Sequence, residues 1–308
     1  MHLEYKYLLP FSVYSKINCE MLPYLVPDKN TQGKTSNDYT VRSLYFDSPQ
    51  LKYYFEKIEG IKIRKKIRIR VYDNYTPEKK AFLEIKRKNE GYVYKERAQL
   101  YFKNIDEFLE TGEAENFIIC PQSDGKAIGY ARTFFYYLIQ ENLHPTILVT
   151  YEREPYYYKF DDDLRITFDK NLRYLSFTDH SELFEEKKLK PALNNKVIIE
   201  IKFNRTFPAW LKNIISRYGL QRQALSKYTI CLQADKNIDL SSVILLAILD
   251  AICICKSLSQ PRTLSKFLQS NDVVLNSKFL YLLQNFTILF VDSNSCSHLF
   301  SLLYICTI

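Results

Sequence analysis

The chain has 308 residues, of which 46% are hydrophobic and 25% are charged, a balance typical of a soluble globular protein. Its formal net charge of +8 is unevenly distributed, because residues 237–308 contain four basic and four acidic residues and contribute none of it. All of the positive excess therefore lies in residues 1–236, where it predicts an acidic partner.

Several common kinds of functional site find no support in the sequence. There is no GxxxxGK[ST] loop and no GxGxxG loop, so we expect a nucleotide to be held in some other way. Only four histidines occur, so histidine-based catalysis has little support. None of the seven cysteines falls into a metal-ligand spacing. The cysteines are interpreted as free thiols in a reducing cytosol, and no N-terminal signal peptide is expected.

Many segments before residue 237 show the period-two alternation of a strand with one polar and one apolar face. In chain order, strands are predicted at 2–8, 40–47, 61–71, 82–88, 93–100, 147–153, 156–160, 164–169 and 197–203. The turn at 89–91 predicts one hairpin, and Glu154-Pro155 predicts a second one between 147 and 160. Helices are predicted within 10–25 and at 51–58, 105–112, 125–143 and 209–219.

The segment 61–71, IKIRKKIRIRV, is the most strongly patterned of these strands. Its alternation places five cations on one face and apolar residues on the other, with Lys65 as the exception. Such a face is costly to bury without anionic partners, so it either lies open or lines a cavity for an anion. The five cations are Lys62, Arg64, Lys66, Arg68 and Arg70.

At least five strands carry long charged side chains on one face, in a chain with few helices to sandwich a sheet. We therefore predict an α+β fold: an antiparallel β-barrel with a charged tunnel inside and helices packed outside. A closed barrel would also leave no sheet edges. The predicted tunnel cations are Lys6, Arg68, Arg70, Lys86, Lys95, Arg153, Arg165, Lys202 and Lys227, interleaved with Glu4, Glu84 and Glu200.

This mixture of charges indicates phosphate chemistry. Arginine binds phosphate oxygens through two parallel hydrogen bonds, and lysine acts as a point charge. Carboxylates among the cations are explained if Mg²⁺ or Mn²⁺ must also be held. A site of this kind would stabilise a phosphoryl group in transfer.

Two other interpretations of the charged faces remain. For any one strand taken by itself, a solvated polar face is the better explanation, but the repetition over five strands favours the tunnel. A nucleic-acid surface would suit the basic residues and the 25 Tyr and 20 Phe. The aligned carboxylates would repel a nucleic-acid backbone in the absence of a metal, so no nucleic-acid partner is expected.

A series of short motifs resembles the VTC domain, the catalytic domain of the vacuolar transporter chaperone polyphosphate polymerases and their bacterial relatives. The motifs are LEYKY, SLYFDSP, IEGIKIRKKIRIRVY, FLEIKRK, VYKER, TYER, LRITFD, VIIEIKFN and SKY, in the family's order over about residues 1–236. The resemblance implies the triphosphate tunnel metalloenzyme fold. It also implies transfer of the γ-phosphate of ATP to a growing polyphosphate chain, with Mn²⁺ or Mg²⁺.

The resemblance also implies roles for individual residues. Catalytic roles fall to Arg68, Arg70, Lys86 and Lys202, and phosphate binding to Lys6, Lys95, Arg153, Lys227, Tyr151 and Ser226. Arg165 joins the phosphate-binding set from its place in the alternating pattern. Glu200 resembles the metal-ligating glutamate, and Glu4 and Glu84 are further candidates. His2 and Ala224 depart from the family, since many relatives have Arg at the first position and fungal polymerases have Lys at the second.

Two rival functions stay open. Tunnel hydrolases cleave triphosphorylated substrates, but they typically begin with a fuller ExExK motif than the Glu4-Tyr5-Lys6 of this chain. A non-catalytic module would bind polyphosphate or nucleic acid without dependence on a metal.

Residues 237–308 form an apolar C-terminal tail outside the resemblance. Its most hydrophobic stretch, 240–255, has 16 residues and is shorter than the ~20 needed to cross a bilayer. The tail is interpreted as a helical appendage or an aberrant extension, and less readily as a weak membrane anchor. The expected location is the cytoplasm, with membrane association through the tail as the alternative.

Overall fold

The computed structural model describes residues 3–31, 36–90, 92–119, 125–161, 163–176, 178–204 and 206–235. The predicted tail, 237–308, lies outside the described residues, so its nature and its boundary stay predictions. Within the described ranges, no helix is both long enough and apolar enough to cross a membrane.

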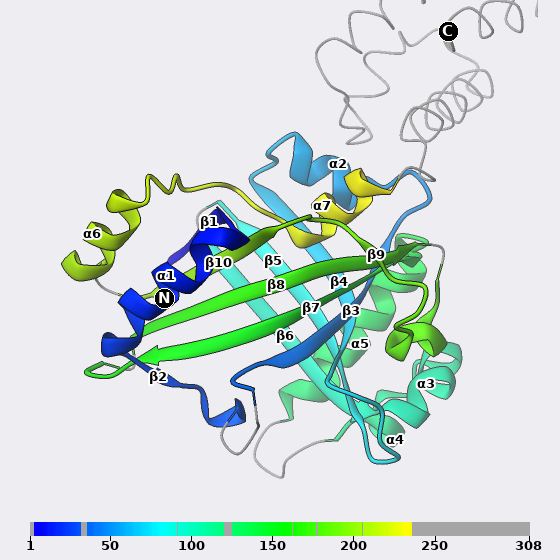
Figure 1. Cartoon of the computed structure of the whole chain (residues 1–308). Helices are drawn as coiled ribbons and strands as arrows, with labels where there is room; N and C mark the ends of the chain where they lie inside the picture. Colours follow the sequence, from blue (N-terminus) through cyan, green and yellow to red (C-terminus); the bar gives the residue numbers. More distant parts are fainter. Residues whose placement is uncertain are drawn as a thin grey trace, which may run out of the picture. The chain divides into compact units, whose positions relative to one another are not determined.

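One antiparallel sheet dominates the fold, with the strand order β1-β10-β8-β7-β3-β4-β5-β6 (Figure 1). These strands are β1 (Leu3–Pro10), β3 (Tyr39–Asp47), β4 (Ile63–Tyr72), β5 (Lys80–Asn89), β6 (Tyr92–Tyr101), β7 (His144–Tyr158), β8 (Leu164–Ser176) and β10 (Lys196–Phe203). The short strands β2 (Leu25–Pro27) and β9 (Lys190–Pro191) pair with β7 and β8.

Helices surround this sheet (Figure 1). They are α1 (Phe11–Met21), α2 (Lys52–Ile58), α3 (Ile105–Thr111), α4 (Ala114–Phe117), α5 (Lys126–Gln140), α6 (Ala209–Arg217) and α7 (Lys227–Ala234). Short 3-10 helices lie at Leu22–Tyr24, Lys29–Thr31, Phe102–Asn104 and His180–Phe184. The described cysteines Cys19 and Cys231 are free thiols.

The predicted fold class is confirmed: the antiparallel sheet curls into a half-barrel with helices around it. The sheet itself does not close, because no backbone pairing joins β6 to β1 within the described ranges. The edge of β1 pairs instead with the segment before α7. Tyr7 forms a bridge with Arg222, and the backbone N–H of Gln223 donates to the carbonyl of Lys6 at 2.9 Å.

Apolar side chains lie on the outer face of the curled sheet, in two separate cores. One core joins β3, β4, β5 and β6 to α3 and α5, through residues such as Ile67, Ile69 and Phe134. The other joins β1, β8 and β10 to α1 and α6, through residues such as Ile199 and Ile215. Buried positions on α5 recur at 127, 131, 134 and 138, the spacing of one helix face. The inner face is thereby left to the charged residues.

The predicted hairpin around Glu154-Pro155 is wrong, because β7 runs without interruption through both residues. Glu154 pairs with Phe168 of β8, and Pro155 pairs with Thr167. Proline is tolerated here because the carbonyl of Pro155 faces the loop at Asp28, whose N–H donates to it at 3.1 Å. No strand partner on that side requires the N–H that proline lacks.

The carboxylate of Asp47 ties three elements together at the end of β3. Asp47 is buried, and it accepts hydrogen bonds from the backbone N–H groups of Ser48, Tyr53 and Tyr54 at 2.8 to 3.0 Å. It also accepts from the hydroxyl of Tyr228 on α7. Because α7 follows Ser226 and begins at Lys227, this carboxylate helps to position a strand and a helix that both border the inner face.

We expect Asp47→Ala to lower the free energy of unfolding by about 2–4 kcal/mol, because it leaves several buried donors without an acceptor. Urea denaturation followed by circular dichroism measures this loss. The control is Asp179→Ala, which removes an exposed carboxylate that accepts from Ser181 and caps a short 3-10 helix. Its expected cost is about 1 kcal/mol or less. Equal losses in the two variants would contradict this role for Asp47.

Candidate functional site

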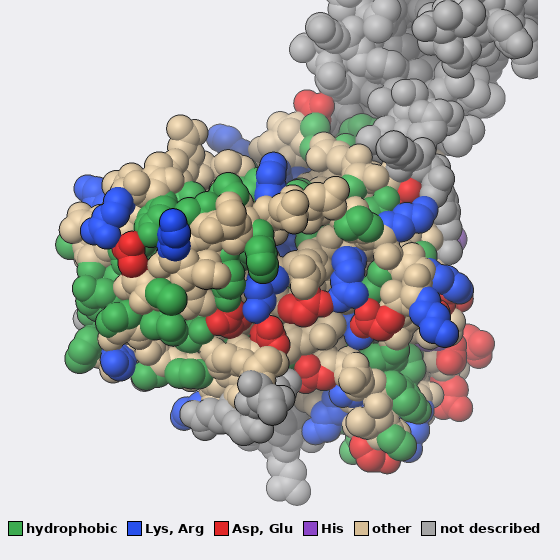
Figure 2. Space-filling model, viewed as in Figure 1, with side chains coloured by type: hydrophobic (Ala, Val, Ile, Leu, Met, Phe, Trp, Pro, Cys, Tyr) green, Lys and Arg blue, Asp and Glu red, His purple; other side chains and the backbone are tan. Residues whose placement is uncertain are grey.

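The curled sheet encloses a cavity of about 1300 Å³ that is strongly basic. Sixteen Lys or Arg residues line it, against four Asp or Glu. The alternation places one of the sixteen, Lys65, on the apolar face of its strand. In agreement with this, its ammonium lies 2.5 Å from Glu141, which does not line the cavity. On the face seen in Figure 2, basic and acidic side chains are interleaved across the middle of the molecule.

Thirteen of the fourteen predicted site residues line this cavity, and the exception is Glu84. The strand register explains the convergence, because it places Lys6 opposite Glu200, Arg68 opposite Glu84 and Lys86 opposite Lys95. The thirteen are Glu4, Lys6, Arg68, Arg70, Lys86, Lys95, Tyr151, Arg153, Arg165, Glu200, Lys202, Ser226 and Lys227. Lys62 lies before β4, is exposed and does not line the cavity.

Glu84 is fully buried among four cations instead of lining the cavity. Its carboxylate lies 2.7 Å from Arg68, 2.6 Å from Lys95, 3.2 Å from Arg97 and 3.9 Å from Arg70. Burial raises the pKa of Glu84, but Arg68 and Arg70 outweigh this effect and hold the pKa well below its usual range. A charged carboxylate so enclosed can fix the arginine side chains, and it has little room to bind a metal.

Glu200 and Asp169 form a pair of buried carboxylates on the opposite side of the half-barrel from Glu84. Arg153 bridges them, at 3.0 Å from Glu200 and 2.7 Å from Asp169. Lys227 also bridges them, at 2.7 Å and 2.5 Å. Burial raises the pKa of Glu200, but Lys227 and Lys6 outweigh it and lower the pKa strongly.

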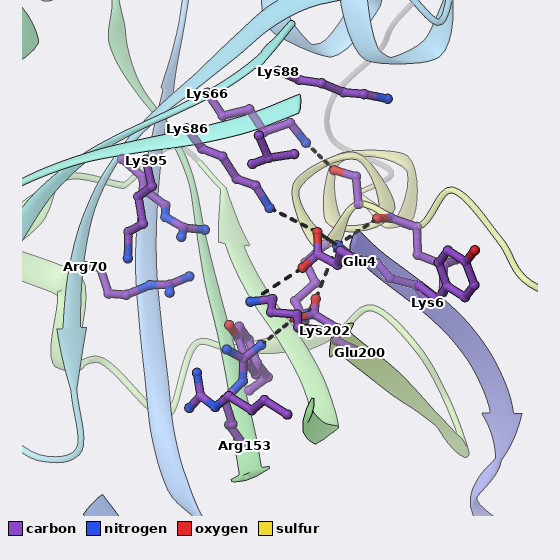
Figure 3. Close-up of a pocket in the computed structure, with 18 of the residues that line it drawn as sticks. Glu4, Lys6, Lys66, Arg70, Lys86, Lys88, Lys95, Arg153, Glu200 and Lys202 are labelled. Carbon is purple, nitrogen blue, oxygen red and sulfur yellow. Dashed lines mark hydrogen bonds and ion pairs between the residues drawn. The ribbon is translucent and has the colours of Figure 1, made fainter. Parts of the chain in front are cut away.

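Glu4 of the edge strand β1 reaches across the cavity to β5, the last strand but one at the other end of the sheet. Its carboxylate lies 3.3 Å from Lys86 of β5, 3.6 Å from Lys202 and 3.8 Å from Lys6 (Figure 3). Burial raises the pKa of Glu4, but Lys6 and Lys86 outweigh it and lower the pKa to about 2. Lys6 also lies 3.3 Å from Glu200, so one ammonium contacts both carboxylates.

The donor set of the cavity fits a divalent cation that is held jointly with substrate. No group of three or more His, Cys, Asp or Glu converges within the described part of the chain. Mg²⁺ and Mn²⁺ at phosphate sites commonly use one or two carboxylates together with phosphate oxygens. Glu4 and Glu200 meet this need, because both line the cavity and share a contact with the cation Lys6.

Sequence reasoning missed several residues of the site. Asp169 and Arg97 lie on the polar faces of predicted strands, so the alternation already pointed to them. Lys66 lies on the predicted basic face but was not included in the tunnel set, and it donates to the Ser226 hydroxyl. Arg222 comes from an irregular segment without any periodic signal, and only the fold brings it to the cavity.

Burial weakens the charge of several lysines in the cavity. Burial and Lys6 lower the pKa of Lys86, Glu4 partly offsets this effect, and the result is about 8. Burial also lowers the pKa of Lys95 to about 8, against the opposing effect of Glu84. Lys66 is affected most strongly, because burial, Lys6 and Lys86 all lower its pKa. With pKa values of about 8, Lys86 and Lys95 can change protonation when an anion enters the cavity.

Two solved structures have a distant similarity to this chain. One is a protein from Hippeastrum described as a putative adenylyl cyclase with a dominant triphosphatase activity. It is 14% identical, with a TM-score of 0.43, over 78% of this chain and 99% of that chain. The other is the PH1819 protein from Pyrococcus horikoshii OT3, 13% identical, with a TM-score of 0.38, over 76% of this chain and 100% of that chain.

Among curated proteins, no match to this sequence was found. The family model of the VTC domain, by contrast, matches residues 2–234. This range includes every strand of the half-barrel and every residue that lines the cavity. The chain therefore belongs to the VTC-domain family.

Proposed function

We propose that this protein is an ATP-dependent polyphosphate polymerase, which transfers the γ-phosphate of ATP to a growing polyphosphate chain inside the basic cavity. The observation that carries the proposal is the charge of the lining, where basic residues outnumber acidic ones four to one. A single triphosphate would leave much of this positive charge unbalanced. A longer phosphate chain beside ATP balances more of it.

In this proposal, the arginines and lysines of the inner face bind phosphate oxygens. Arg68, Arg70 and Arg153 supply planar guanidinium groups suited to two parallel hydrogen bonds. Lys86 and Lys202 add positive charge beside Glu4. Glu84 and Asp169 act as positioning residues, because each is buried behind the cations that it holds.

Glu4 and Glu200 would hold Mn²⁺ or Mg²⁺ together with phosphate oxygens. When bound, such an ion neutralises negative charge on the phosphates. In the transfer, a terminal oxygen of the polyphosphate forms a bond to the γ-phosphorus of ATP, and the bond to the β-phosphate oxygen breaks to release ADP. The attacking oxygen is already anionic, so the protein needs to align and neutralise charges rather than to remove a proton.

We expect the full-length protein with ATP and Mn²⁺ to produce a polyphosphate ladder on a stained gel, with matching ADP. Glu200→Gln should abolish the ladder while ATP binding persists, because the change removes a negative ligand but keeps the side-chain shape. Free phosphate without a ladder would identify a tunnel triphosphatase instead. Neither product, with polyphosphate binding unaffected by metal, would identify a binding module.

We expect Arg68→Ala to weaken polyphosphate binding by about tenfold or more, because it removes a guanidinium that faces the cavity. The matched control is Arg87→Ala on the neighbouring strand β5. Arg87 pairs with Glu96 and Tyr137 and does not line the cavity. Competition with fluorescent polyphosphate measures both affinities. Similar losses in both variants would mean that overall charge, and not this site, determines binding.

The pKa values of about 8 for Lys86 and Lys95 make binding dependent on pH. The protonated lysines attract the anion, so we expect polyphosphate affinity to fall several-fold between about pH 7 and about pH 9 as they lose protons. In the double variant Lys86→Arg/Lys95→Arg, the guanidinium groups stay charged and the profile should flatten. Isothermal titration calorimetry across this range tests the idea, and parallel profiles would refute it.

A further inference from the structure

We infer that the cavity contains a separate subsite for a segment of polyphosphate that lies beyond the carboxylates. The subsite is a cluster of five cations that form no ion pair with a described acidic residue, here called the unpaired cluster: Lys57, Arg64, Lys66, Lys88 and Arg222. This inference rests on the proposed polyphosphate binding and adds to it a defined place for the part of the chain that is not reacting.

The cations that line the cavity fall into two groups. Apart from Lys65, ten of them form ion pairs with acidic side chains of the protein. The five members of the unpaired cluster form no ion pair with any acidic residue in the described ranges. Glu56 acts on Arg64 through space, but it forms no ion pair with it. The protein therefore leaves the charge of this cluster for a ligand to balance.

The unpaired cations gather in one region, although they come from different elements. Arg64 of β4 lies opposite Lys88 of β5 in the strand register, and Lys66 lies opposite Lys86. Lys57 belongs to α2, and Arg222 belongs to the segment before α7. In Figure 3, Lys66 and Lys88 leave their strands on the side of the cavity away from Arg70 and Arg153.

The pKa shifts of two of these lysines indicate that the cations lie close enough to repel one another. Burial lowers the pKa of Lys57, and Arg64 and Lys88 lower it further. Burial also lowers the pKa of Lys88, to which Arg64 and Arg222 add. A cluster of half-buried like charges destabilises the free protein, and a bound polyanion would remove that cost.

The layout of the cluster favours an extended anion. From Arg70 to Arg64 the basic face of β4 extends about 20 Å at ~3.3 Å per residue. A triphosphate held between the arginines and Glu200 would leave Arg64 and Lys88 without an anionic partner, although Arg64 donates to the backbone carbonyl of Ile61 at 2.6 Å. A linear polyphosphate can contact both ends, so the chain would extend from the carboxylates past Lys66 toward Lys88 and the exposed Arg222.

The test compares two ligands on the full-length protein: long-chain polyphosphate and tripolyphosphate. We expect Arg64→Ala/Lys88→Ala to weaken long-chain binding by about tenfold or more, and tripolyphosphate binding by less than about twofold. The matched control is Lys62→Ala/Arg87→Ala, which also removes two positive charges. Lys62 directly precedes β4, Arg87 lies in β5, and neither residue lines the cavity. It should change neither affinity. Thermal melting of each variant verifies folding.

Three outcomes would overturn the inference. Equal losses for both ligands would mean a single undivided site, and unchanged long-chain affinity would mean that the cluster is not used. Equally strong binding of a single-stranded oligonucleotide that is lost in the same variant would assign the cluster to nucleic acid. Binding requires no turnover, so a ligand difference in a protein that makes no polyphosphate would support the subsite and refute only the polymerase.

Discussion

Positive charge held inside a curled sheet is the constraint on which the rest of this structure depends. Strands with a row of cations on one face cannot pack that face against an apolar core. Three buried carboxylates, Glu84, Asp169 and Glu200, make the arrangement tolerable, because each contacts several cations at once. A buried ion pair does not by itself stabilise a fold, but a buried cation without a partner would strongly destabilise it.

The same constraint explains why the protein is apolar on the outside of its sheet. Since the inner face is charged, hydrophobic burial must occur between the outer face and the helices, in two cores on different halves of the sheet. The site depends on contacts between these halves. Glu4 reaches from β1 to Lys86 of β5, and Asp47 holds α7 through Tyr228 next to Lys227.

The cations that line the cavity differ in their partners, and this difference suits them to different roles. Cations held by buried carboxylates have fixed positions, which suits groups that must align a reacting phosphate. Cations without acidic partners keep their charge available but destabilise the free protein. Such a cluster is typical of a binding site, where a protein is less stable than it could be because the site must bind a ligand. The proposed polymerase uses both kinds, the first for chemistry and the second for the chain.

Local alternation in the sequence predicted the main strands and the charged inner face, and thirteen of the fourteen predicted site residues line the cavity. This success has a simple cause, since period-two patterning is a property of neighbouring residues. The order of the motifs also indicated the family that the family model matches. What alternation could not show was which charges become partners.

Only the tertiary structure decided those partners. It showed that Glu84 is enclosed by arginines, that Asp169 supports Arg153, and that Lys66 contacts Ser226 across 160 residues of sequence. It also showed that β7 continues through Pro155 and that the sheet stays open at β1. Each of these features depends on strand register and on segments far apart in the chain. A single sequence carries no local signal for them.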